Sequence, residues 1–351
     1  MNYIGSKLKL SSWIEEEVKK VVGSDLSQKV FCDIFAGTGI VGRTFKPHLK
    51  QVISNDLEHY SFVLNKNYIE NHKAIADKEK YIEELNSLPL IKNGFIYQNY
   101  CMGSGSERQY FSDENGKKID TMRTKIREWK ESNAIDERLY YFLLASLVES
   151  ADKIANTASV YGAFLKHVKK SALKELVLEP AHFLEKGNSH VVFNRDSNEL
   201  IKEIEGDILY LDPPYNQRQY SANYHMLNTI TQYDDFVPKG KTGLREYNRS
   251  DYSKKNEVHA SFEELIKNAN FQYIFLSYNN EGLMSEEEVK NIMSKYGKYD
   301  LQTKAYQRFK SRPELKFSTS EGLNPESYKT ENRNHTADKT YEYLHILEKR
   351  Q

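Results

Sequence analysis

Short apolar runs recur along the chain and predict the strands of an α/β sheet. The run 208–211 carries only aliphatic and aromatic side chains, which is typical of a parallel strand covered on both faces. Two prolines follow this run at once and prevent the strand from continuing. Similar runs predict six further strands, at residues 29–35, 51–54, 94–100, 271–278, 304–310 and 341–348.

Apolar residues spaced three or four positions apart predict helices between these strands. Residues 135–154 give the clearest case, because their apolar side chains form one stripe that is expected to enter the core. Helical patterns also cover 10–21, 60–90, 119–130 and 286–296. We expect loops at 101–118, 238–255 and 311–340.

The composition excludes some classes of protein but does not identify a single class. With 351 residues the chain is long enough for one large domain, or for a domain with a sizeable insert. Acidic and basic residues balance at 50 each, so a surface that binds phosphate has to be a local patch. Two cysteines and no long apolar run lead us to expect a cytoplasmic protein with no membrane segment and no disulfide framework.

A glycine turn follows the first predicted strand and indicates a ligand that contains adenosine. Gly37, Gly39 and Gly42 match the dinucleotide fingerprint, and Asp56 lies after the second strand, where an acid that binds ribose is expected. Asp33 stands directly before the turn, where its charge would repel a pyrophosphate but attract an ammonium group. S-adenosylmethionine has the ammonium group and lacks phosphate, so it fits best.

Two further motifs suggest chemistry at the ends of predicted elements. Tyr3, Gly5, Ser6 and Lys7 form a glycine turn before the first helix, a place that can hold a small anionic ligand. The second motif, Asp212-Pro213-Pro214-Tyr215, ends the strand 208–211, and ligands of open α/β sheets bind at such carboxyl ends. Its carboxylate and the first proline carbonyl can accept hydrogen bonds from a planar amine, and the tyrosine ring can stack on a base.

Basic residues in three stretches are candidates for contacts with the phosphates of a nucleic acid. Those in 156–174 are expected on a helix, although they fit a solvated lysine face equally well. A second group follows the proline motif, and a third lies in the basic loop 238–255. The candidates are Lys166, Lys169, Lys170, Arg218, Lys241, Arg245 and Arg249.

The chain resembles the Dam-like class of adenine-specific DNA methyltransferases in three motifs and in their order along the sequence. The motifs are Tyr3 to Lys7, then Asp33 to Gly39 with Asp56, then Asp212 to Tyr215. The resemblance implies a Rossmann-like, seven-stranded methyltransferase fold. Residues 1–99 and 200–351 would form the catalytic domain, and 100–199 an inserted, largely helical target-recognition region. The family usually has Trp and Gly where this chain has Tyr3 and Ser6. Tyrosine keeps a stacking face, so we expect cofactor binding to survive.

The resemblance also assigns roles to residues. Asp212, Pro213, Pro214 and Tyr215 would form the pocket for an adenine flipped out of double-stranded DNA, with no metal ion required. Methylases of this class occur in restriction-modification systems, so a cognate restriction endonuclease and a bacterial cytoplasm are expected. The residues expected to bind S-adenosylmethionine are Tyr3, Gly5, Ser6, Lys7, Asp33, Phe35, Ala36, Gly37, Thr38, Gly39, Asp56, Leu57 and Asp212.

Other functions remain open at this point. A cytosine-N4 DNA methyltransferase would use the same geometry, and an RNA adenine methyltransferase the same chemistry. A nicotinamide-dependent oxidoreductase fits the glycine turn alone but leaves the motifs at Lys7 and Asp212 unexplained. A DNA-binding subunit that has lost catalysis would not need an intact Asp-Pro-Pro-Tyr motif.

Overall fold

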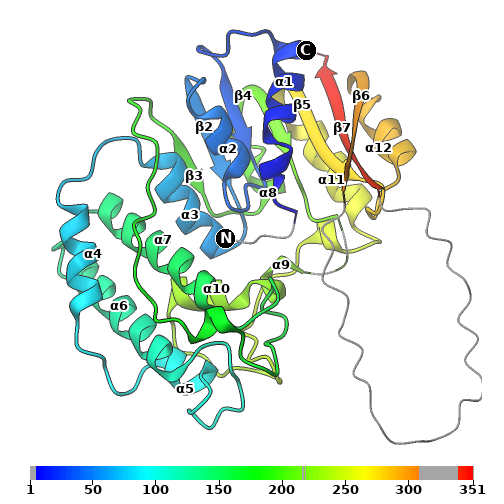
Figure 1. Ribbon diagram of the computed structural model, residues 1–351. Helices are drawn as coiled ribbons and strands as arrows, with labels where there is room; N and C mark the ends of the chain where they lie inside the picture. The colour runs from blue at the N-terminus through cyan, green and yellow to red at the C-terminus, as the bar shows by residue number, and fades with distance from the viewer. Residues whose placement is uncertain (1–4, 216, 218, 308–338, 351) are drawn as a thin grey trace, which may run out of the picture.

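The strands form one mixed sheet in the order β3-β2-β1-β4-β5-β7-β6, which confirms the predicted seven-stranded, Rossmann-like fold (Figure 1). The computed structural model describes residues 5–215, 217, 219–307 and 339–350. The strands are β1 (Val30–Asp33), β2 (Gln51–Asn55), β3 (Val191–Phe193), β4 (Glu205–Leu211), β5 (Asn270–Asn279), β6 (Gly297–Gln307) and β7 (Lys339–Lys349).

The strand order creates a switch point between β1 and β4. From β1 the chain passes outward through β2 to β3, and it then returns to place β4 on the other side of β1. These strands and β5 run parallel, whereas β7 pairs antiparallel with both β5 and β6. Helices that start from neighbouring strands leave in opposite directions at such a point, and a crevice forms at the carboxyl ends of the strands.

Alternating side chains of the sheet fill two separate cores. Ile208 and Tyr210 of β4 pack with α1 (Ser11–Val22) and α2 (Ile40–Phe45). On the opposite face, Leu209 and Leu211 pack with α11 (Val258–Asn268) and α12 (Glu286–Met293). Both faces are therefore covered, which explains why 208–211 carries no charged residue.

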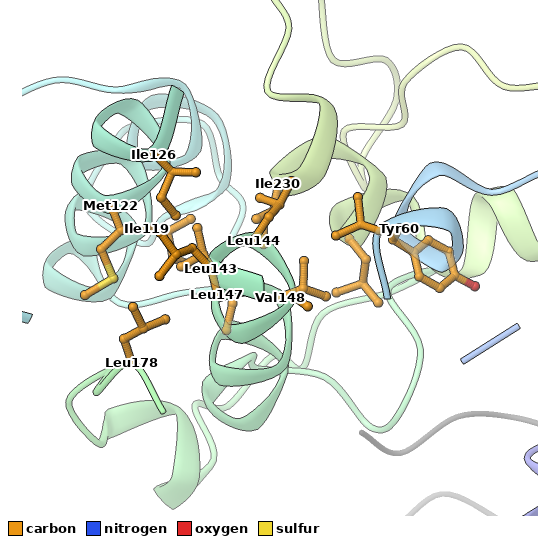
Figure 2. Packing of buried hydrophobic residues seen from close by; sticks show 14 of the residues in the cluster. Tyr60, Ile119, Met122, Ile126, Leu143, Leu144, Leu147, Val148, Leu178 and Ile230 are labelled. Atoms are coloured by element: carbon orange, nitrogen blue, oxygen red, sulfur yellow. The ribbon is translucent and has the colours of Figure 1, made fainter. Parts of the chain in front are cut away.

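A third core lies beside the sheet and is built mainly from helices (Figure 1). Figure 2 shows residues of this core, among them Leu143, Leu144 and Leu147 of α7 (Glu137–Ile154), Ile126 of α6 (Asp113–Glu131) and Ile230 of α10 (His225–Gln232). The helices that contribute are α3 (His59–Asn65), α4 (Lys78–Ser87), α5 (Phe95–Tyr100), α6 (Asp113–Glu131), α7 (Glu137–Ile154) and α10 (His225–Gln232).

The predicted strand at 94–100 is wrong, because this segment forms helix α5. The Asp120 carboxylate accepts hydrogen bonds from the backbone N–H groups of Ile96 (2.9 Å) and Tyr97 (2.8 Å) in the first turn of α5. These donors have no partner inside a helix, so a buried acid from α6 stabilises the helix start. The sheet instead takes its outer strand from β3, three residues long, which the sequence analysis missed.

Other predicted boundaries also need correction. Helix α6 begins at Asp113, capped by Ser112, so it takes in part of the expected loop 101–118. The lysine-rich stretch 156–174 is irregular apart from a single 3-10 turn, Lys170–Leu173, and does not form the expected helix. The expected strand 304–310 starts earlier, at Gly297, and its last three residues lie outside the described part of the chain, as does most of the loop 311–340.

The helical layer does not coincide with the expected insert 100–199. Its core begins with α3 and α4 and takes in α10, which follows the Asp212 motif, whereas β3 falls inside 100–199 and belongs to the sheet. A role for this layer in target recognition stays a prediction. Among the helices of the described residues, none has the length and apolarity needed to cross a bilayer.

Removing a large side chain from the helical core should destabilise the protein. Leu144→Ala leaves a cavity at a position that is fully buried on α7, and we expect the free energy of unfolding to fall by about 2–5 kcal/mol. Leu173→Ala is the matched control, because that leucine is 66% exposed. Urea unfolding of both variants measures the difference, and equal losses would contradict the assignment of Leu144 to the core.

Candidate active site

A cavity of about 350 Å³ opens at the carboxyl ends of β1 and β4, at the switch point of the sheet. Most of the residues predicted to bind a cofactor line this cavity, although they come from three distant parts of the chain. Tyr3 lies outside the described residues, and Gly39 supports the cavity without lining it. The predicted residues in the lining are Gly5, Ser6, Lys7, Asp33, Phe35, Ala36, Gly37, Thr38, Asp56, Leu57, Asp212 and Pro214.

The glycine turn after β1 has a backbone that requires glycine. Gly37 and Gly39 have φ values of 52° and 75°, in the left-handed region that other residues rarely adopt. The Asn65 amide of α3 donates to the Gly37 carbonyl (3.0 Å) and accepts from the Ser54 hydroxyl (2.9 Å). A β-carbon at Gly39 would lie 2.5 Å from the Asn65 amide oxygen, so the amide and the turn fit only with glycine there.

Asp56 joins the end of β2 to the glycine turn. One carboxylate oxygen accepts from the Gly37 N–H (2.7 Å) and the other from the Glu58 N–H (2.8 Å). Burial is the main reason that the pKa of Asp56 is raised to about 7. Each oxygen can accept another hydrogen bond, so the side chain suits a ribose hydroxyl while it fixes the turn.

Asp33 is the clearest sign of a cationic ligand. Its side chain is only 1% exposed, and its Oδ1 atom has no hydrogen-bond partner among the described residues. Burial, followed by the neighbouring Asp212 and Asp56 carboxylates, holds the pKa of Asp33 well above its usual range. An ammonium group would supply both the missing donor and the compensating charge, so the cavity fits S-adenosylmethionine.

Lys7 is bound by two protein carboxylates. Its ammonium lies 3.1 Å from an Asp212 oxygen and 2.8 Å from a Glu342 oxygen, and the residue is buried. Burial lowers the pKa of Lys7, but the two carboxylates more than offset it and leave the pKa well above the ordinary value. The anionic partner expected for this motif is therefore part of the protein itself.

The Asp212 motif leaves β4 at the edge of the cavity. Burial raises the pKa of Asp212 to about 6, with Lys7 acting in the opposite direction. Pro213 is buried, and the Tyr215 carbonyl accepts a hydrogen bond from the Leu283 N–H (3.0 Å). Gly5 lies close by, since a β-carbon there would meet the Tyr215 hydroxyl at 3.7 Å. The N-terminal motif, Gly5 to Lys7, and the Asp212 motif are thus in contact.

The predicted DNA-binding residues fall into different environments. Lys169 donates to the Thr157 carbonyl (2.9 Å), and Arg245, whose side chain is 11% exposed, forms a bidentate pair with Asp234 (both 3.0 Å). These contacts account for both side chains without a nucleic acid. Arg218 lies outside the described residues. The exposed candidates are Lys166, Lys170, Lys241 and Arg249.

Several residues of the site were missed by the sequence analysis. Asp196 and Ser197 line the cavity after β3, a strand too short to be recognised. Tyr252 packs edge-on against Phe35, at 4.9 Å between ring centroids, and nothing local in its sequence predicts this contact. Glu342 had a usable signal, because it shares a face of β7 with Leu344 and Ile346, and an acid on an apolar face needs a partner.

Comparisons with known proteins agree with the motifs. A family model described as D12 class N6 adenine-specific DNA methyltransferase matches residues 3–292. The type II methyltransferase M.NlaIII of Neisseria lactamica is 62% identical over 349 residues, or 99% of each chain. The type II methyltransferase M.CviAII of Paramecium bursaria Chlorella virus 1 is 39% identical over 89% of this chain and 93% of its own. M.FokI of Planomicrobium okeanokoites is 42% identical over 89% of this chain and 50% of its own.

Substitution of Gly39 tests the fit between the glycine turn and Asn65. We expect Gly39→Ala to lower the free energy of unfolding by more than the roughly 1–2 kcal/mol of left-handed backbone strain, and to weaken binding of S-adenosylmethionine. Gly105→Ala is the control, because Gly105 also has a positive φ of 81° but nothing within 4 Å of its β-carbon position. Urea unfolding and calorimetric titration would measure both effects. The same loss in both variants would mean that the contact with Asn65 contributes nothing.

Proposed function

The chain belongs to the family of D12 class N6 adenine-specific DNA methyltransferases, and from this membership we propose the roles of its residues in transferring a methyl group to adenine. The enzyme uses S-adenosylmethionine and acts at adenine N6 in DNA. The observation that carries the assignment of roles is the meeting of Asp212 and Asp33 in one cavity, at the switch point between β4 and β1. A cationic methyl donor and a planar amine would meet there.

Asp212 and the Pro213 carbonyl prepare the target amine for attack. The lone pair of an adenine amine is delocalised into the ring, so the amine is a poor nucleophile. Two acceptors that hold its hydrogens favour the pyramidal geometry in which the lone pair is free, and they act most strongly in the transition state. S-adenosylmethionine supplies an electrophilic methyl group on a sulfonium. The Asp212 carboxylate must be ionised for this role, which its pKa of about 6 allows at neutral pH.

Residues on the β1 side of the cavity hold the cofactor. The Asp33 carboxylate pairs with the ammonium group, because its buried Oδ1 has no other partner among the described residues. Asp56 accepts from the ribose hydroxyls beyond the bonds that it makes to the Gly37 and Glu58 backbones. The edge-on pair of Phe35 and Tyr252 offers an apolar wall for the adenine ring of the cofactor.

The face of Tyr215 stacks on the target adenine once that base has left the duplex. Extrusion of a base costs a few kcal/mol, which contacts to the DNA backbone have to offset. A hollow beside the cavity is suited to those contacts, because Arg249, Lys254 and Lys255 line it. Gln219 lines both the hollow and the cavity, so a DNA strand in the hollow would pass the mouth of the active site.

The relatives suggest a biological setting. M.NlaIII and M.CviAII are described as type II methyltransferases, and both align with nearly the whole of this chain. We infer that this enzyme protects host DNA beside a cognate restriction endonuclease, in the cytoplasm of a bacterium. The helical layer built around α6 and α7 is the part proposed to recognise the target sequence. Membership in an adenine-specific family favours adenine over cytosine, and DNA over RNA.

Substitution of the catalytic acid tests the proposed chemistry. Asp212→Ala removes one of the two acceptors, and we expect transfer of labelled methyl from S-adenosylmethionine to unmethylated DNA to fall by about 10²-fold or more. Asp207→Ala is the control on the same strand, because Asp207 pairs with Lys29 at the amino end of β4 and lies outside the cavity lining. Digestion to nucleosides should show the label in N6-methyldeoxyadenosine. Label in cytosine, or full activity of Asp212→Ala, would refute the proposal.

Substitution of Arg249 tests the proposed path of the DNA. Arg249→Gln removes an exposed cation from the hollow, so we expect weaker DNA binding and a slope of log K against log salt that is smaller by about one. Arg350→Gln is the control, since Arg350 is an exposed arginine after β7 and belongs neither to the lining of the hollow nor to the helical core. Fluorescence anisotropy at several salt concentrations measures both quantities. An unchanged slope for Arg249→Gln would exclude a phosphate contact by this residue.

A further inference from the structure

Glu342 of β7 stands next to the catalytic acid, although it is remote in sequence from every motif of the site. It is 1% exposed, and its carboxylate binds the Lys7 ammonium at 2.8 Å, closer than Asp212 at 3.1 Å. The Ser277 hydroxyl of β5 donates to the same carboxylate oxygen. We propose that Glu342 is a positioning residue, which holds the Lys7 ammonium away from full pairing with Asp212. The inference rests on the proposed function of Asp212.

The position of Glu342 argues against an incidental salt bridge. The side chain shares a strand face with Leu344 and Ile346, which belong to the core between the sheet and α1. A carboxylate buried on such a face costs several kcal/mol unless it is paired and hydrogen-bonded. Lys7 and Ser277 provide that compensation, so this corner of the core is arranged around a negative charge.

The charges around Asp212 explain what the second acid does. Lys7 faces Asp212 from the N-terminal turn, Glu342 from β7 and Asp33 from β1, while the phenols of Tyr210 and Tyr220 face it from β4 and α9 (Tyr220–Asn223). One ammonium is therefore shared between the carboxylates of Asp212 and Glu342. Because Lys7 is shared, its positive charge offsets less of the negative charge of Asp212 than it would in a simple ion pair.

That charge is needed at the moment of methyl transfer. An Asp212 oxygen has to accept a hydrogen bond from the target amine, whose N–H groups become more acidic as the new bond to carbon forms. Without Glu342, the ammonium would pair with Asp212 alone and compete with the amine for the Asp212 carboxylate. The second acid thus keeps the first one available as an acceptor.

The effect on pH dependence follows from the same charges. Burial raises the pKa of Asp212 to about 6, and the negative charge of Glu342 contributes to the increase. Without that negative charge, the positive charge of Lys7 dominates around Asp212 and lowers the pKa of its carboxyl. The ionised form would then persist to lower pH, so the acid limb of the pH–rate profile should move to lower pH even as the rate on the plateau falls.

The test is Glu342→Gln, which keeps the shape of the side chain and an oxygen for Ser277 while it removes the charge. We expect the single-turnover rate of methyl transfer to fall about tenfold or more, and the acid limb to move to lower pH, with affinity for S-adenosylmethionine little changed. General damage to the fold would lower the rate without that shift. Glu17→Gln is the control, because Glu17 is also buried and paired with a lysine, Lys20, but lies on α1 outside the cavity lining.

Glu342→Asp keeps the charge and shortens its reach, so it decides the matter if Glu342→Gln does not fold. We expect a single-turnover rate below that of the parent but above that of a site without this negative charge. The acid limb of the pH–rate profile should stay near that of the parent. Parental rate and profile in Glu342→Gln, or an acid limb displaced to lower pH in Glu342→Asp although the charge is kept, would overturn the inference. If the parent itself transferred no methyl group to DNA, the proposed function would fail first and the inference with it.

Discussion

The site depends on the two ion pairs that the Lys7 ammonium makes, one with Asp212 and one with Glu342. They join the N-terminal turn, the end of β4 and the strand β7, which are far apart in sequence. The lysine is buried, so loss of either acid would leave a charge with less compensation in a region of low dielectric. Gly5, two residues before Lys7, lies beside Tyr215 and Tyr220, since a β-carbon on it would meet both hydroxyls within 4 Å.

Acidic residues outnumber basic residues in the lining of the cavity, which suits a cationic cofactor. Asp33, Asp56 and Asp212 line it with Lys7, and burial raises the pKa of all three acids. A site of this kind carries an electrostatic cost that a positively charged ligand relieves on binding. Arg249, Lys254 and Lys255 lie in the neighbouring hollow, where phosphates would be bound. On the proposed function, the cofactor would bind among the acids and the DNA among the bases, so each would meet charges of the opposite sign.

Local patterns were enough to predict the parts of the site that depend on neighbouring residues. The strand before Asp212 and the turn from Gly37 to Gly39 are each specified within a few residues, by prolines and by positive φ values. The segment 94–100 was mistaken for a strand because its helix depends on Asp120, which approaches it from α6. Glu342 has a local signal, an acid on an apolar strand face, but that signal does not identify its partner Lys7, which lies at the other end of the chain. Where local patterns do not specify the structure, contacts between residues far apart in the sequence determine it.

Glu58 connects the cofactor side of the cavity to the target side. Its backbone N–H binds Asp56, which holds the glycine turn, and its buried carboxylate accepts from the Asn228 amide of α10 (2.6 Å) and from the Ser221 hydroxyl of α9. Both helices follow directly after the Asp212 motif. Because α10 also packs in the helical core, one buried carboxylate ties the glycine turn, the catalytic segment and the helical layer into a single framework. On the proposed function, a base bound at Tyr215 would meet a cavity whose cofactor side and target side are joined through the hydrogen bonds of Glu58.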